Sequence, residues 1–300
     1  MRKMLVLTLL TLASAAAAQT CNGRLIEHAM GTSCVPHTPK RVVVLDTGEL
    51  DSALALGVKP VGSVVAFEGA ALPEYLKTRT AGIANVGTIQ QPSLEKILAL
   101  KPDLILSSKL RHGQIYAQLS RIAPTVMAET VGVTWKSNFL LDARALGKTA
   151  EANRIMAAYQ NRIKNFQKNS GRARKATEVS VVRFVPGETR IMMKASFIGT
   201  VLEDAGLKRP KAQDKNVFRE TASPERIPDL EGDVLFYSSY GPPEGTEQNL
   251  YLSSPLWKRL KVVQAGRAYR VSDDHWMLGI GILAANRVLD DLERYLASGR

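Results

Sequence analysis

Histidine is scarce in this sequence, and its few copies do not cluster. The four are His28, His37, His112 and His275. No two of them form a spaced pair on one predicted helix, whereas bare Zn²⁺ or Mn²⁺ needs three or four converging ligands. The run Asp273-Asp274-His275 is more typical of a solvated turn. We therefore expect no metal ion to be bound directly by protein side chains.

Common catalytic motifs are also missing. Neither the G-x-S-x-G elbow of serine hydrolases nor the H-E-x-x-H pattern of metalloproteases occurs. The pair Gly279 and Gly281 lacks the spacing of a phosphate-binding loop and does not follow a clear strand. We expect no catalytic residues and no enzymatic activity.

Long hydrophobic runs are lacking beyond the first residues, since none approaches the about 18 apolar residues that a membrane helix needs. Residues 1–19 have the order of a secretory signal peptide. Arg2 and Lys3 come first, the apolar run MLVLTLLTL follows, and ASAAAAQ offers small residues for cleavage. We expect an exported protein in the periplasm or elsewhere outside the cytoplasmic membrane, either soluble or held by a lipid.

Cysteine occurs only twice, at Cys21 and Cys34. An exported protein meets an oxidising compartment, so the sequence predicts a disulfide that closes a small N-terminal loop. The alternative is a lipid on Cys21, which follows the signal peptide closely. Thr20 fits poorly there, because a small residue is expected before a lipid-bearing cysteine.

Acidic residues are outnumbered by basic ones, which gives a formal charge of +12. Removal of Arg2 and Lys3 with the signal peptide leaves 12 − 2 = +10. Such a balance suits nucleic acid, an anionic membrane or an anionic ligand. The basic residues are scattered, and their densest stretch, 162–175, is typical of a solvated helix face and its exit loop. An exported protein rarely meets nucleic acid, so an anionic small ligand is the interpretation to test.

Strand and helix patterns alternate along the first half of the mature chain. The segments 41–46, 60–66 and 103–107 are apolar enough for buried strands, and helices are predicted at 48–57, from Ser93, and at 113–122. Repeated β-α-β units with short connections favour a parallel sheet covered on both faces.

The pattern changes at Trp135. Residues 135–169 contain no proline and one glycine, and their apolar residues recur at helical spacing. A second α/β series follows, up to a final helix from Gly281. The sequence thus predicts an α/β fold of two Rossmann-like lobes with mainly parallel sheets. The predicted boundaries are 20–134 for the first lobe, 135–169 for one long connecting helix, and 170–300 for the second lobe.

One charged residue contradicts the pattern of its strand. Arg183 stands in the middle of the apolar segment SVVRFV, where burial without a partner would cost several kcal/mol. Either an acidic neighbour such as Glu188 pairs with it on an edge strand, or the guanidinium faces a binding site. Trp135 and Trp257 are expected in the core.

Several segments in this order resemble one family. They are EHAMGTSCVPHTPKRVVVL, SLEKILALKPDLI, IYAQLSRIAPTV, VVRFVPGETRI, IPDLEGDVLFY and GILAANRVLDDL, and together they cover essentially the whole mature chain. The chain is similar to the iron-siderophore substrate-binding proteins of bacterial ABC importers, with two lobes joined by a long helix. It looks closest to members that take hydroxamate or citrate-hydroxamate siderophores.

The resemblance implies a ligand cleft between the lobes, at the carboxyl ends of the strands. Arg183 and Arg190 would then offer guanidinium groups to an anionic ferric chelate. Ligand contacts are also expected from the other candidates: Arg111, Lys109, His112, Tyr240 and Trp276. Core packing is the alternative for Tyr240 and Trp276, and a surface position is the alternative for His112.

Two glutamates occupy matching places in an internal echo, SLE at Glu95 and SPE at Glu225. The resemblance implies that one such carboxylate on each lobe meets arginines of the membrane permease. The alternative is that each only complements the dipole of its helix.

The resemblance implies a monomer that needs no cofactor and carries a ferric siderophore as its transported ligand. Haem or cobalamin is the alternative ligand, with Tyr240, His112 or Met277 as the axial candidates for haem. A ligand-sensing receptor with the same cleft is the alternative role.

Overall fold

The first lobe is built on five parallel strands in the order β5-β4-β3-β6-β7. The computed structural model describes residues 21–169 and 176–297, so the predicted signal peptide at 1–19 lies outside the described residues. The central strands are wholly buried, as expected where helices cover both faces of a parallel sheet. The strands are β3 (Val42–Val44), β4 (Gly62–Val65), β5 (Ala84–Thr88), β6 (Leu104–Ser108) and β7 (Thr125–Ala128).

Short helices connect these strands. Asp46 caps α1 and Ser93 caps α3, where the Ser93 hydroxyl accepts from the Lys96 amide at 3.3 Å. The helices are α1 (Thr47–Ala55), α2 (Lys77–Thr80), α3 (Leu94–Ala99), α4 (Lys109–His112) and α5 (Tyr116–Ile122).

The second lobe has a mixed sheet in the order β10-β9-β8-β11-β12. Strands β8, β11 and β12 are parallel, and β9 runs antiparallel to both β8 and β10. Strands β8 and β9 therefore form a hairpin around Pro186-Gly187. Its strands and their neighbours are β8 (Val179–Val185), β9 (Glu188–Met192), β10 (Arg219–Ala222), β11 (Val234–Ser239) and β12 (Ala268–Arg270).

Helices surround this second sheet. The α-helices are α9 (Phe197–Asp204), α10 (Gln248–Ser253), α11 (Pro255–Arg259), α12 (Lys261–Gln264) and α13 (Ile282–Ala297), and a 3₁₀ helix spans Pro224–Leu230. Trp257 is buried against Phe184 and Tyr237, so its predicted core position is confirmed.

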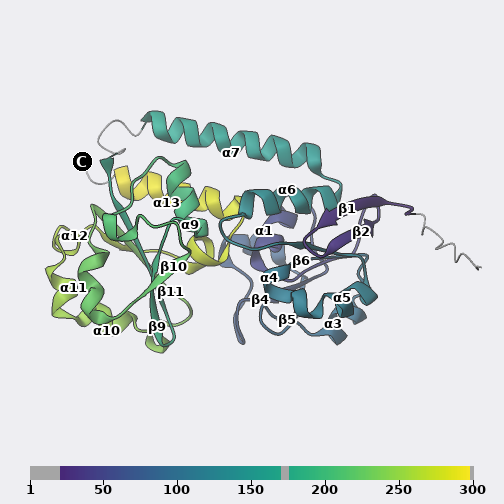
Figure 1. Ribbon diagram of the computed structural model, residues 1–300, viewed down its shortest axis with the longest axis horizontal. Helices are drawn as coiled ribbons and strands as arrows, with labels where there is room; N and C mark the ends of the chain where they lie inside the picture. The colour runs from purple at the N-terminus through teal and green to yellow at the C-terminus, as the bar shows by residue number, and fades with distance from the viewer. Residues whose placement is uncertain (1–20, 170–175, 298–300) are drawn as a thin grey trace, which may run out of the picture.

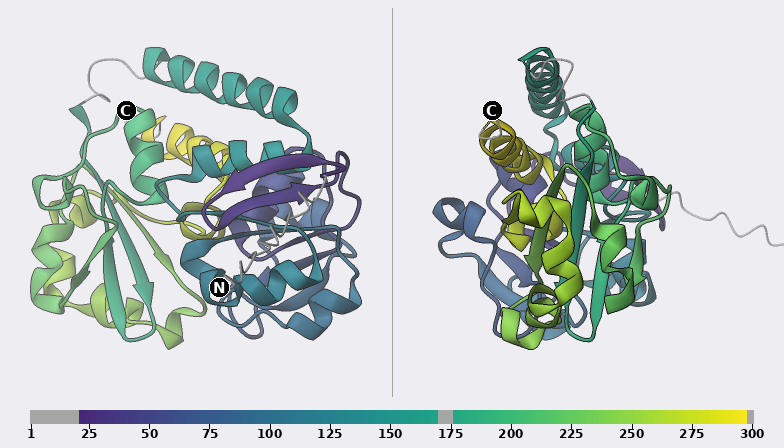
Figure 2. Two further views of the ribbon diagram at one scale, coloured as in Figure 1. Left: turned by 45° about the vertical axis from the view of Figure 1, so that its right-hand side comes forward. Right: turned by 90° about the vertical axis from the view of Figure 1, so that its left-hand side faces the viewer.

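The prediction of one continuous helix over 135–169 is wrong. The segment forms α6 (Trp135–Leu146) and α7 (Thr149–Asn169), and Gly147 between them has a φ of 70°. This left-handed conformation ends a helix and suits glycine. Helix α7 spans the two lobes, and α6 lies on the first lobe (Figures 1 and 2). Trp135 is buried as predicted, and its indole N–H donates to Thr200 in the second lobe at 3.0 Å.

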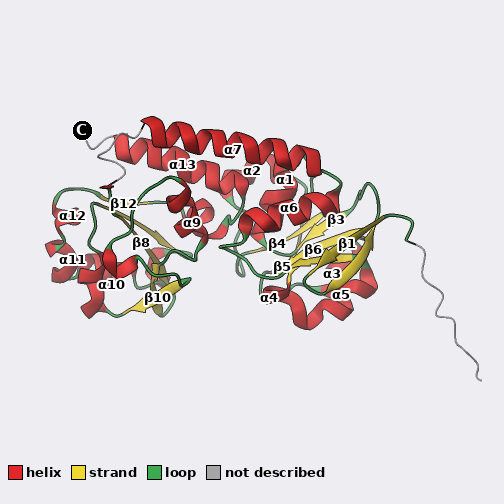
Figure 3. Cartoon of the chain, turned by 45° about the horizontal axis from the view of Figure 1, so that its top comes forward, coloured by secondary structure: helices red, strands yellow, loops and turns green. Residues whose placement is uncertain are grey.

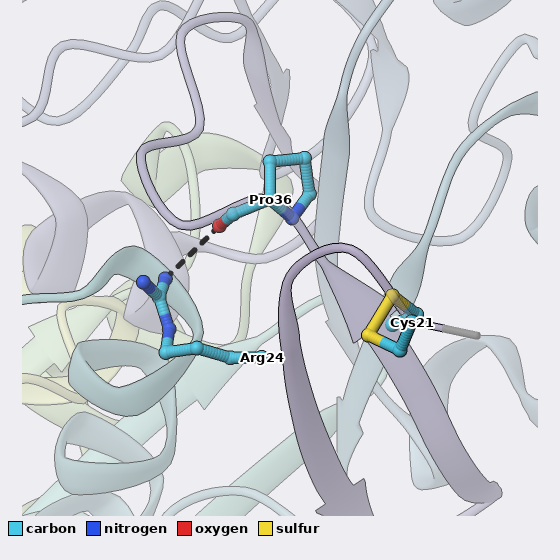
Figure 4. Close-up of a disulfide and its surroundings, with 4 residues drawn as sticks. Cys21, Arg24 and Pro36 are labelled. Atoms are coloured by element: carbon cyan, nitrogen blue, oxygen red, sulfur yellow. Dashed lines mark hydrogen bonds between the residues drawn. A yellow bond between two sulfur atoms is a disulfide. The ribbon is translucent and has the colours of Figure 1, made fainter.

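The described part of the chain starts with a hairpin of β1 (Arg24–His28) and β2 (Gly31–Val35), which packs beside β7. Cys21 and Cys34 form a disulfide with their Cα atoms 5.6 Å apart, which confirms the predicted pairing (Figure 4). Next to it, the Arg24 guanidinium donates to carbonyls of Pro36 and His37 and to two carbonyls in the last turn of α6. Arg24 thus fixes the hairpin to the elbow between α6 and α7.

Helix α13 lies beside α7 (Figure 3), and Arg162 joins them through Asp290 at 2.6 Å. The first turn of α13 contacts the first lobe, where the buried Asp51 carboxylate accepts from the amides of Leu283 and Ala284 at 2.8 and 2.9 Å. The lobes are therefore connected by packing as well as by the chain.

None of the helices in the described ranges is both long and apolar enough to cross a membrane.

Candidate functional site

A cavity of about 450 Å³ lies between the two lobes. In the first lobe, the segments after four strands line it: Asp46 follows β3, Gln90 follows β5, Arg111 follows β6 and Gly132 follows β7. In the second lobe, Arg183 near the end of β8 and Tyr240 after β11 line it. Converging carboxyl ends of strands are where open α/β sheets place ligands. The expected interlobe cleft is therefore present.

Four arginines line this cavity: Arg111, Arg183, Arg190 and Arg219. Each uses its Nε–H to bind a carboxylate. Within residues 21–169 and 176–297, the Nη groups of Arg111, Arg190 and Arg219 make no hydrogen bond. The end of each of these guanidinium groups is thus free to donate two parallel hydrogen bonds to an incoming oxyanion.

Arg183 lies on a central strand of the sheet, not on an edge, and its partner is Asp273. Its Nε and Nη2 donate to the two Asp273 oxygens at 2.8 and 2.5 Å, and Ser238 donates to the same carboxylate at 2.9 Å. The alternative pairing with Glu188 is wrong, because Glu188 binds Arg190 instead. Only 10% of the Arg183 side chain is exposed, so this ion pair is what makes the charge tolerable inside the sheet.

Glu188 binds two of the cavity arginines. It accepts from Arg190 at 2.7 Å, from Arg219 at 3.3 Å and from the Thr221 hydroxyl at 2.6 Å. Burial opposes its ionisation, but these hydrogen bonds outweigh that effect and lower the pKa of Glu188 to about 2. Arg190 also lies directly opposite Arg183 across the β8–β9 ladder, a like-charge pair that needs such acidic partners.

In the first lobe, Arg111 pairs with the fully buried Asp46 at 2.8 Å. The Asp46 carboxylate raises the pKa of Arg111, so the guanidinium stays charged. Asp46 also accepts from the amide of Thr47 at 2.7 Å, which caps α1. One third of the Arg111 side chain remains exposed to the cavity, consistent with its predicted role.

Tyr240 joins the lobes and lines the cavity. Its hydroxyl donates to the Ala66 carbonyl of the first lobe at 3.1 Å, and its ring packs edge-on against Phe67. The Arg183 guanidinium lies over the same ring, 4.6 Å from its centroid. Tyr240 is therefore a cleft aromatic, as expected from the sequence.

Trp276 borders the cavity but is fully buried, and its indole N–H donates to Asp291 at 2.8 Å. This N–H already has a partner and is not available to the ligand. The indole packs against Phe236, so the core alternative describes most of its surface.

Lys109 and His112 do not line the cavity. Lys109 points to Glu129, which accepts at 2.8 Å on the surface. His112 is buried, and its two ring nitrogens bind the Ser107 hydroxyl and the Ile89 carbonyl, both at 2.7 Å. Burial lowers the pKa of His112, so it supports the loop as a neutral ring. Lys109 and His112 lie within two residues of Arg111 in the sequence and share the short helix α4 with it, but their side chains do not line the cavity.

Asp46 and Arg219 were missed by sequence reasoning. Asp46 ends the predicted strand 41–46, so its position at a carboxyl end was a usable signal. Arg219 reaches the cavity because β10 pairs with β9, and no local pattern reveals that pairing. Glu95 and Glu225 are both exposed in the first turn of a helix, away from the cavity wall.

The sequence profile of the Periplasmic binding protein family matches residues 42–274. A probable siderophore-binding lipoprotein of Bacillus subtilis, YfiY, is 43% identical over 284 residues, which covers 91% of this chain and 87% of that protein. The achromobactin-binding periplasmic protein of Dickeya dadantii is 32% identical and covers 85% of this chain and 86% of its own length. The crystal structure of Staphylococcus aureus SirA with staphyloferrin B matches with a TM-score of 0.81 and 34% identity, over 91% of this chain and 98% of that one.

Proposed function

The chain belongs to the periplasmic binding protein family, and from this we propose that it captures a ferric siderophore outside the cytoplasmic membrane and delivers it to an ABC importer. The siderophore would be of the citrate-hydroxamate or hydroxamate type. The family and the relatives are substrate-binding proteins and not enzymes. The ligand is therefore transported cargo and not a cofactor.

The cavity with four arginines is the observation that carries this proposal. Ferric complexes of citrate-type siderophores usually carry net negative charge, and free guanidinium ends bind carboxylate and hydroxamate oxygens well. No group of three or more metal-ligating side chains occurs among the described residues. The siderophore itself would supply the oxygen atoms that surround the iron.

Tryptophan fluorescence tests the proposal, because Trp276 borders the cavity. The mature protein is titrated in parallel with ferric schizokinen, ferric citrate, ferrichrome, haemin and the iron-free chelators. Saturable quenching by a ferric citrate-type or hydroxamate chelate, at submicromolar concentration, is the expected result. Quenching by haemin alone would replace the ligand and keep the transport role.

Haem and cobalamin have less support than a siderophore. His112 is outside the cavity with both nitrogens bound, and the Tyr240 hydroxyl already donates to Ala66. Met277 lines the cavity but is mostly buried. A ligand-sensing receptor would use the same cleft, and uptake of labelled ferric siderophore by cells distinguishes transport from sensing.

Glu95 and Glu225 are proposed to dock the two lobes of a monomer onto the permease. Each is an exposed carboxylate on a different lobe, and such charges orient a partner more than they add affinity. Hydrogen bonding from Ser223 lowers the pKa of Glu225, so its charge persists at neutral pH. Charge reversal of both residues should abolish uptake while the affinity for the siderophore in solution stays the same. Unchanged uptake would reject the docking role.

A further inference from the structure

The interlobe cavity has an apolar end that an all-polar chelate would not need. Arg190 and Met192 lie two residues apart on β9, so both face the cavity from the same side of the sheet. Met192 pairs with Arg219 on β10, and the cavity wall changes from charged to apolar at this pair. The apolar end is formed by residues of both lobes: Val131, Gly132, Met192, Phe197, Ile198 and Phe218.

Phe218 forms the rim of this apolar end. It directly precedes Arg219, whose guanidinium carbon lies 5.8 Å from the centroid of the Phe218 ring. A Cβ added to Gly132 would lie 3.9 Å from Cε2 of Phe218, so the ring extends across to the backbone of the first lobe. Even so, 45% of Phe218 is exposed. The ring therefore borders the cavity and the solvent at the same time.

The backbone holds Phe218 in this exposed position. The Phe218 carbonyl accepts from the Met193 amide at 3.2 Å, and the Val217 carbonyl accepts from the Ala195 amide at 3.1 Å. These bonds tie the residues before β10 to the segment that leads into α9. An apolar wall that continues into an exposed ring, with charged groups beside it, is typical of a surface that a ligand covers.

We propose that the apolar end, rimmed by Phe218, is a subsite for an acyl arm of the siderophore, so that the transported cargo is an amphiphile. The inference rests on the proposed function. The anionic head would lie against the arginines, and the arm would run over Met192 and Phe197 to Phe218. Displacement of water from an apolar wall favours an apolar group, whereas a polar arm would lose hydrogen bonds to water there without replacing them.

The size of the cavity agrees with an arm that reaches the rim. Its volume of about 450 Å³ lies in the lower part of the range of small-ligand pockets, about 300–1,000 Å³. A chelate head would fill most of this space. A long arm would then extend to the rim, where the exposed ring of Phe218 can cover it.

The test compares ferric schizokinen with an analogue whose hydroxamate acyl groups are lengthened from acetyl to octanoyl, by quenching of tryptophan fluorescence. The iron-binding oxygens and the charge are the same in both chelates, so only the arms differ. Each methylene group that becomes buried raises affinity about fourfold, so two of them give about tenfold. The wild type should therefore bind the octanoyl chelate about tenfold more tightly. Phe218→Ala should bring the two dissociation constants to within about threefold.

Val217→Ala is the matched control, because Val217 is also 45% exposed but does not line the cavity. It should keep the wild-type ratio of the two dissociation constants. Any effect of Phe218→Ala on the neighbouring Arg219 acts on both chelates and cancels in this ratio. If Phe218→Ala does not fold, Val131→Thr carries the test, since it places a hydroxyl in the apolar end without changing its shape, and the ratio should fall.

Two results would overturn the acyl subsite alone. One is equal binding of the two chelates by the wild type. The other is a preference for the octanoyl chelate that persists unchanged in the folded variant. Absence of binding of both chelates would overturn the proposed ligand, and the subsite with it.

Discussion

At the scale of single residues, the site is organised by carboxylates that hold arginines in place. Asp46 and Glu188 bind the Nε–H groups of cavity arginines and leave the Nη groups to the ligand, whereas Asp273 binds both Nε and Nη2 of Arg183. A guanidinium that is already oriented loses less entropy when the ligand arrives. The arginines differ in how far their removal would disturb the fold, and this difference decides which variants are informative.

Arg219→Gln is the cleanest test of ligand contact. Glu188 keeps Arg190 and Thr221 as donors when Arg219 is removed, so the fold should tolerate the change. Affinity for a carboxylate-bearing ferric siderophore should fall by about 1.5–3 kcal/mol, the value of a hydrogen bond to a charged group. Arg154→Gln, on the exposed side of α7, is the control and should bind like wild type. Equal dissociation constants for the two variants would remove Arg219 from the site.

Arg183→Ala should act mainly on stability. The change leaves the buried Asp273 carboxylate without its cation, which costs about 3–5 kcal/mol in comparable buried pairs. Urea unfolding measures this loss. Adding Asp273→Asn to the variant should recover part of it, since the unpaired charge is then gone. If the double variant is no more stable than Arg183→Ala, the unpaired Asp273 charge is not the cause of the lost stability.

The residue types of the site were predictable, but their partners were not. Arg183 was singled out because a charge interrupts an apolar strand, and Arg190 and Arg111 were expected from the family resemblance. Asp273 lies 90 positions from Arg183 in the chain and meets it only through the fold. Lys109 and His112 were misplaced for the same reason, since a turn of four residues decides which of three neighbouring side chains enters the cavity.

At the scale of elements, the largest difference between the sequence prediction and the structure is the elbow between α6 and α7 at Gly147. Helical spacing predicted the helical content of residues 135–169 correctly, but one glycine was read as tolerated inside a helix. Its left-handed conformation ends α6, and the Arg24 guanidinium and the His37 carbonyl occupy the space beside it. Local sequence does not reveal such contacts.

Gly147→Ala should destabilise the protein by more than its backbone strain alone. A left-handed alanine costs about 1–2 kcal/mol, and a Cβ at this position would lie 2.9 Å from Nη1 of Arg24. Gly57→Ala is the matched control, because Gly57 has a similar φ of 73° and open space around it. Denaturant unfolding should rank Gly147→Ala as clearly the less stable. Equal losses of unfolding free energy in the two variants would show that the contact with Arg24 does not contribute to the destabilisation.

Asp51 should make the stability of the lobe junction depend on pH. Burial raises its pKa from 3.8 to about 6, despite hydrogen bonds from Leu283, Tyr75 and Ala284. The folded carboxyl group binds its proton more tightly than the unfolded one. Its contribution is therefore fully present below about pH 4 and is lost as the pH rises to about 6, by about 3 kcal/mol. The difference in unfolding free energy between wild type and Asp51→Asn should change by this amount across that window, and parallel curves would contradict it.

At the scale of the whole molecule, the two-lobed α/β architecture followed from the sequence because strand and helix patterns alternate on both sides of a long helical segment. The close connection between the lobes could not be predicted from the sequence. Helix α7, the capped start of α13 and the Tyr240–Ala66 contact all cross between them. Each is distant in sequence from its partner. Together they limit how far the lobes can separate, so we expect modest closure on binding rather than a wide hinge motion.

The most direct test of the central claim is a crystal structure of the protein loaded with a ferric citrate-type siderophore. The chelate should lie in the interlobe cavity, with its anionic oxygens within hydrogen-bonding distance of the Nη groups of Arg111, Arg190 and Arg219. Asp46 and Glu188 should still hold the Nε–H groups, and the lobes should have moved little. A chelate bound outside the cavity, or inside it with no guanidinium contact, would contradict the account.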